Sequence, residues 1–161
     1  MSQGKLEGGI SGGVEELYRE VILDHFKSPK NRGSIENANA VAEGMNPLCG
    51  DQLTLSAKIE NDKIIDIKFE GHGCAISQSA ASMLTQAVRG KNLTDVSELS
   101  RLFKNMFGIK EGNKNLDSKI SEDDLGDLIS LEGVKKYPVR VKCAVLSVNT
   151  LKEAINSYLK I

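Results

Sequence analysis

Two runs of alternating apolar and polar residues, separated by Asn61 and Asp62, constrain the fold most strongly. Every second residue between 52 and 60 is apolar, and the alternation resumes between residues 65 and 69. Successive residues of a strand point to opposite faces, so each run gathers its apolar side chains on one face. The sequence therefore predicts a hairpin with one buried face. Residues Ala40 to Met45 predict a third strand beside it.

Apolar residues spaced by three and four predict helices on both sides of this hairpin. The predicted ranges are 14–26, 75–88, about 95–107 and 121–131, followed by a last helix after Pro138. Thr94 is the expected N-cap of the third helix. Residues 108–119 are polar and charged and predict a loop. The expected fold class is α+β, a small three-stranded antiparallel sheet covered by helices.

The length of 161 residues is that of one ordinary domain with one core. Residues 1–13 contain five glycines, and ordering so many glycines would lose much backbone entropy. We expect a flexible tail over residues 1–13 and a single domain over residues 14–161.

The charge balance argues against a nucleic-acid partner. Lys and Arg total 21 against 22 Asp and Glu, and the chain has no Trp with which to stack bases. No apolar run reaches the length of a membrane span, so no membrane partner is expected. An odd number of cysteines, without an apolar leader at the N-terminus, predicts reduced thiols in the cytoplasm.

The three cysteines lie in three separate local motifs, and they are the candidate functional residues. Cys49 and Asp51 are two residues apart at the entry to a strand, so both side chains would share a face. Cys74 lies between the hairpin and a helix, whose N-terminus favours a thiolate. Cys143 falls in the first turns of the last helix, beside Arg140, where neighbouring cations would also favour a thiolate.

Any one cysteine taken alone is more often a core residue than a ligand. Three together, with a carboxylate beside one of them, favour a metal or redox site, since three thiols and one carboxylate could form a tetrahedral soft-metal shell. His72 is expected to be a surface imidazole rather than a ligand. The position of His25 on its predicted helix is consistent with a hydrogen-bonded packing role and equally with a functional role.

At these motifs the chain resembles the SufU-like proteins, the zinc-dependent sulfur-transfer branch of the superfamily that also contains the IscU and NifU iron-sulfur scaffolds. The likeness runs from Leu17 to Tyr158. Its motifs are residues 17–19 with 24–26, residues 46–51, residues 73–77 and residues 138–143. The family's fold agrees with the predicted elements.

The resemblance implies a ligand set and a reaction. In the family the matching positions bind metal, which implies zinc on Cys49, Asp51, Cys74 and Cys143. The implied partners are a SufS-type cysteine desulfurase, which supplies persulfide sulfur, and a downstream iron-sulfur scaffold. One ligand must leave the metal to accept sulfur. We expect Cys49, since its loop is the one most able to move while Asp51 remains in place, with Cys143 as second choice.

Two alternatives remain open from the sequence. One is an iron-sulfur cluster scaffold that binds iron or a transient cluster, and the other is a structural zinc protein. Lys142 stands where the classical scaffolds have His, and the added stretch from about Gly108 to Val134 resembles the zinc-dependent branch. Asp51 as a ligand argues against a closed structural site, which usually uses Cys and His.

Overall fold

The computed structural model describes residues 2–161, with side chains described from Gly13 onward. Its sheet has three antiparallel strands in the order β1 (Ala40–Asn46), β2 (Asp51–Glu60) and β3 (Lys63–His72). Asn61 and Asp62 both adopt positive φ, 51° and 59°, which gives the two-residue turn that suits a twisted hairpin. The predicted three-stranded sheet and its turn are confirmed.

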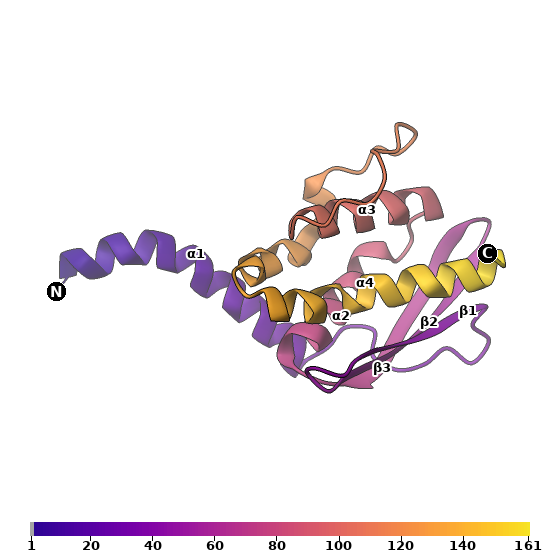
Figure 1. Cartoon of the computed structure of the whole chain (residues 1–161), viewed down its shortest axis with the longest axis horizontal. Helices are drawn as coiled ribbons and strands as arrows, with labels where there is room; N and C mark the ends of the chain where they lie inside the picture. Colours follow the sequence, from indigo (N-terminus) through magenta and orange to yellow (C-terminus); the bar gives the residue numbers. More distant parts are fainter. Residues whose placement is uncertain (1) are drawn as a thin grey trace.

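Two helices cover one face of this sheet. Helix α2 (Ala75–Val88) packs against β3, and α4 (Pro138–Leu159) lies along β1 and β2, as Figure 1 shows. The two helices also contact each other. Between the sheet and the helices lies the apolar core, which includes the fully buried residues Leu55, Phe69, Leu84 and Leu151. The alternation of apolar residues along the strands, and their spacing by three and four in the helices, are the patterns that predicted these elements.

Three further helical segments complete the fold. They are α1 (Ser2–Lys27), α3 (Leu93–Asn105) and the 3-10 segment η1 (Glu122–Lys136). Figure 1 shows the N-terminal half of α1 extending away from the sheet. In η1 the backbone is interrupted at Gly126, whose φ of 55° and ψ of −130° are not helical. Glycine tolerates this conformation because it has no Cβ.

Three local predictions differ from the structure. The helix expected at residues 121–131 is the 3-10 segment η1, which extends to Lys136. The N-cap of α3 is Asn92, not Thr94: Asn92 has extended backbone, and its side chain accepts a hydrogen bond from the Asp95 N–H at 2.8 Å. Helix α1 begins at Ser2, whereas the sequence predicts its start at Val14. The side chains of residues 1–12 lie outside the described set, and the flexibility of residues 1–13 stays a prediction.

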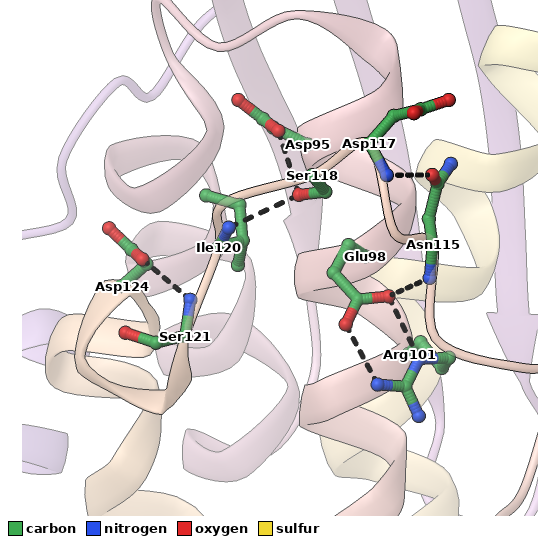
Figure 2. A network of polar contacts seen from close by, with 9 residues as sticks. All are labelled: Asp95, Glu98, Arg101, Asn115, Asp117, Ser118, Ile120, Ser121 and Asp124. Atoms are coloured by element: carbon green, nitrogen blue, oxygen red, sulfur yellow. Dashed lines mark hydrogen bonds and ion pairs between the residues drawn. The ribbon is translucent and has the colours of Figure 1, made fainter.

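The predicted loop at residues 108–119 runs back along α3 and is fastened to it by polar contacts (Figure 2). The buried Glu98 carboxylate accepts two hydrogen bonds from Arg101, at 2.9 and 2.7 Å, and one from the Asn115 N–H at 3.3 Å. Ser118 donates to Asp95 at 2.8 Å. These contacts give a polar segment a fixed position without an apolar core of its own.

Among the helices of residues 2–161, none combines the length and the apolar character that crossing a membrane requires.

Candidate metal centre

The first part of the site is the connection from β1 to β2. The Cys49 N–H donates to the Asn46 carbonyl at 3.2 Å, which closes a turn between the two strands. This turn leaves Cys49 half-buried and places Asp51 at the first position of β2, where its side chain is only 1% exposed. Adjacent Leu48 is 71% exposed, so the Cys49 loop lies at the surface.

Cys74 is the N-cap of α2, as its position between strand and helix predicts. Its Sγ accepts a hydrogen bond from the Ser77 N–H at 3.5 Å, and its own N–H donates to Asp51 Oδ1 at 2.8 Å. Gly73 precedes it with φ of 150°. A Cβ at Gly73 would overlap Asp51 Oδ1 and lie 2.9 Å from Ser77 Oγ. Glycine is therefore required for this approach of backbone to carboxylate.

Cys143 reaches the same point from the other end of the chain. It lies in the second turn of α4, which begins with Pro138, and its side chain is fully buried. Its Sγ lies 3.1 Å from Cys49 Sγ. The exposed Arg140, one turn earlier, places Nη1 at 3.6 Å from Cys49 Sγ. The packing of α4 against the sheet thus brings a distant thiol to the β1–β2 turn.

Three of the four predicted site residues meet at one place. Donor atoms of Cys49, Asp51 and Cys143 all lie within 4.8 Å of one another. Cys74 Sγ lies outside this group, 3.9 Å from Asp51 Oδ2. Two sulfurs bound to one tetrahedral zinc ion at about 2.3 Å are roughly 3.8 Å apart. The Cys49 and Cys143 sulfurs, 3.1 Å apart, are closer than this, so they would have to separate slightly to share an ion. The chemistry of these donors, thiols with one carboxylate, fits zinc. Their role as metal ligands stays a prediction.

The ionisation of the site reflects its burial and its internal hydrogen bonds. Burial opposes ionisation of Asp51, but hydrogen bonds from the Cys74 N–H and from neighbouring side chains outweigh it and hold the pKa of this carboxyl below its usual value. Burial raises the pKa of the Cys143 thiol well above its ordinary value, and hydrogen bonding with Cys49 and Asp51 raises it further. At Cys143, burial and these hydrogen bonds therefore outweigh the effect that the neighbouring cations were expected to have on the pKa of the thiol.

The two histidines lie away from these donors. His72 is exposed at the end of β3, as predicted for a surface imidazole. His25 is buried, with Nδ1 2.7 Å from Ser82 Oγ and Nε2 2.8 Å from Asp127 Oδ2. Of the two roles left open for His25, the hydrogen-bonded packing role is the one observed. Asp127 is 102 residues away from it, and no local pattern predicted the pair.

One site residue was missed by sequence reasoning. The side-chain amide of Asn46 contacts both Asp51 and Cys143 inside the site. The available signal was a polar residue at the end of a strand, directly before a Pro-x-Cys turn. Polar residues are common in turns, so this position alone did not indicate a role in the site.

Comparisons with known proteins show the family of this chain. The model of the NifU-like N terminal domain matches residues 17–144. The chain is 41% identical over 146 residues to the zinc-dependent sulfurtransferase SufU of Bacillus subtilis, which covers 91% of this chain and 94% of that protein. It is also 41% identical over 142 residues to the iron-sulfur cluster assembly scaffold protein IscU of Streptococcus pyogenes, covering 88% and 84% of the two chains.

Solved structures show the same architecture. A protein from Fervidobacterium islandicum AW-1, described as a cluster assembly scaffold for the SUF system, superposes with a TM-score of 0.75 at 42% identity, over 84% of this chain and 94% of that one. A NifU-like N-terminal protein from Brucella abortus shares the fold at 20% identity, with a TM-score of 0.76 over 91% and 97% of the two chains. On this evidence, the chain belongs to the NifU-like N-terminal domain family.

Proposed function

We propose that this protein accepts sulfur from a cysteine desulfurase and passes it on for iron-sulfur cluster assembly. Cys49, Asp51, Cys74 and Cys143 would hold one zinc ion. Bound zinc would keep the thiols deprotonated and, having no redox chemistry, would leave them reduced. The chain is 41% identical to SufU of Bacillus subtilis over most of both sequences, which supports this proposal.

The observation that carries the proposal is the different placement of the three thiols. Cys143 is fully buried, while Cys49 and Cys74 are both half-buried. Cys74 caps helix α2 with its sulfur, whereas Cys49 lies on the exposed turn between β1 and β2. A persulfide on another protein must come into contact with the accepting sulfur. Cys49 is therefore the acceptor that we propose, and the burial of Cys143 argues against the second choice.

The transfer itself is a displacement at sulfur. The Cys49 thiolate attacks the terminal sulfur of the desulfurase persulfide, a new S–S bond forms at Cys49, and the S–S bond of the donor breaks. The electron pair of the broken bond leaves with the desulfurase thiolate, so no further oxidant or reductant is needed. Arg140 places Nη1 3.6 Å from Cys49 Sγ, so a positive charge lies beside the attacking sulfur.

The partners follow from this chemistry. We propose a SufS-type desulfurase as sulfur donor and an iron-sulfur scaffold as recipient. We place the reaction in the reducing cytoplasm, because all three cysteines are free thiols in the structure and the transfer needs them reduced.

A second candidate function is cluster assembly on this protein itself. The equal identity to the IscU scaffold of Streptococcus pyogenes supports it, and the same four donors could hold iron. Lys142 argues against it, because a cation occupies a position where a neutral ligand would serve a cluster. Analysis of metal and sulfide after anaerobic purification separates the two functions: about one zinc per chain supports sulfur transfer, and stoichiometric iron with sulfide supports the scaffold.

The experiment that tests the acceptor uses Cys49→Ser with His72→Ala as control. Each protein is incubated with a SufS-type desulfurase and cysteine. Mass spectrometry then locates the residue that carries the added mass of ~32 Da per sulfur atom. We expect sulfur at Cys49 in the parent and in His72→Ala, and none in Cys49→Ser. Sulfur found only at Cys143, with full transfer in Cys49→Ser, would refute the assignment.

A further inference from the structure

Asn46 is a buried amide that lies among the proposed ligands without being one of them. It is the last residue of β1, stands opposite Asp51 in the β1–β2 register, and is only 6% exposed. A buried primary amide needs hydrogen-bond partners, because leaving its donors unpaired costs about 1–3 kcal/mol. The partners it has are the site residues themselves.

Asn46 touches three of the four proposed ligands. Its Nδ2 lies 3.3 Å from Asp51 Oδ2 and 3.4 Å from Cys143 Sγ. Its backbone carbonyl accepts the Cys49 N–H at 3.2 Å. The ionised carboxylate of Asp51 can only accept hydrogen bonds, so the amide must turn its nitrogen, not its oxygen, toward the site.

These contacts treat the ligands unequally. The amide N–H groups contact the donor atoms of Asp51 and Cys143, which are both buried, whereas Asn46 contacts Cys49 only through its backbone. Hydrogen bonds to a ligand orient it. The polar side chain that contacts the Cys49 sulfur is the exposed Arg140, so Asn46 orients the Asp51 and Cys143 donors and not the Cys49 sulfur.

We propose that Asn46 is a positioning residue of the metal centre: its side-chain amide fixes Asp51 and Cys143 as stationary ligands, while its carbonyl closes the turn that carries Cys49. The part that concerns sulfur transfer rests on the proposed function. The part that concerns metal retention can be tested without a desulfurase.

The test compares two substitutions of Asn46 with a substitution of Asn39, an exposed asparagine directly before the other end of β1. Asn39 also makes two side-chain hydrogen bonds, donating to the Ile59 carbonyl and accepting the Ile59 N–H, both at 2.8 Å, but it lies away from the site. The variants are Asn46→Ala, Asn46→Asp and Asn39→Ala. Each is loaded with zinc, and its affinity is measured by competition with a chromophoric chelator beside its thermal unfolding temperature.

We expect Asn46→Ala to weaken zinc binding by about 10–100-fold, the range typical of groups that hydrogen-bond metal ligands. Asn46→Asp, with nearly the same shape, should weaken it further, because a carboxylate would repel Asp51 and the thiolates. Asn39→Ala should lower the unfolding temperature and leave zinc affinity within about twofold of the parent. In cobalt-substituted protein, the thiolate charge-transfer band should shift in the Asn46 variants and not in Asn39→Ala.

The opposite results identify which proposal fails. The positioning role would be overturned if both Asn46 variants kept the zinc affinity and the cobalt spectrum of the parent. This holds whether or not the variants unfold at a lower temperature. If the Asn46 variants lose zinc as expected but the parent never accepts sulfur from the desulfurase, the positioning role stands and the proposed function falls.

Discussion

Glu98 of α3 should contribute substantially to stability, because it forms a buried ion pair with Arg101 of the same helix and accepts a hydrogen bond from the Asn115 N–H of the 108–119 loop (Figure 2). The Glu98 side chain is 1% exposed and that of Arg101 is 17% exposed. Removing one partner of a fully buried pair costs about 3–5 kcal/mol. Arg101 keeps some access to water, which reduces the penalty of leaving it alone. For Glu98→Ala we therefore expect a loss of about 2–3 kcal/mol in the free energy of unfolding at pH 7.

The assay is urea unfolding of the zinc-loaded protein, with amide hydrogen exchange at Asn115 as local readout. The matched control is Glu132→Ala, which removes a pair with Lys135 at 3.9 Å between two half-exposed side chains. Such surface pairs contribute about 0–1 kcal/mol. Glu98→Ala should also speed exchange of the Asn115 N–H, whose acceptor it removes.

The pH dependence supplies a second test. Hydrogen bonds from Arg101 lower the pKa of Glu98 in the folded protein, so its contribution is fully present above the unfolded pKa of about 4.3. The contribution is lost as the pH falls through the folded pKa. The stability difference between parent and Glu98→Ala should therefore shrink below about pH 4. A difference under about 0.5 kcal/mol at pH 7, the scatter of neutral surface substitutions, would refute the reasoning.

Three further predictions concern the site and the N-terminus. Asp51→Ala should weaken zinc binding by about 100-fold in chelator competition. The free energy of unfolding of the metal-free protein should fall by no more than about 3 kcal/mol, since the principal lost contact is one backbone hydrogen bond. Unchanged zinc affinity would remove Asp51 from the ligand set. Gly73→Ala should displace the Asp51 carboxylate and weaken zinc binding at least about tenfold. Gly90→Ala is the control: Gly90 also has positive φ, but a Cβ there would meet no atom within 4 Å, so zinc affinity should be unchanged. Deleting residues 1–12 should change the unfolding temperature by less than about 2 °C, because a sequence so rich in glycine loses much backbone entropy on ordering and has few side chains to pack. A larger loss in a thermal scan would contradict the tail prediction.

Local periodicity predicted most of the fold. Helix α2 has the predicted bounds, and the hairpin turns at Asn61 and Asp62, because strand and helix patterns depend on residues a few positions apart. The N-cap of α3 was placed wrongly because Asn92 and Thr94 are both good capping residues, and the backbone conformation decides which one is used.

The sequence by itself determined which residues could form the site, since Cys49, Asp51, Cys74 and Cys143 are recognisable from their local motifs. Only the tertiary structure decided how they differ. Cys143 is buried and Cys49 only half-buried because α4 packs its apolar face onto β1 and β2, bringing together sulfurs that are 94 residues apart. The contacts of Asn46 arise in the same way. Packing between distant segments sets the environment of each thiol, and no local pattern encodes it.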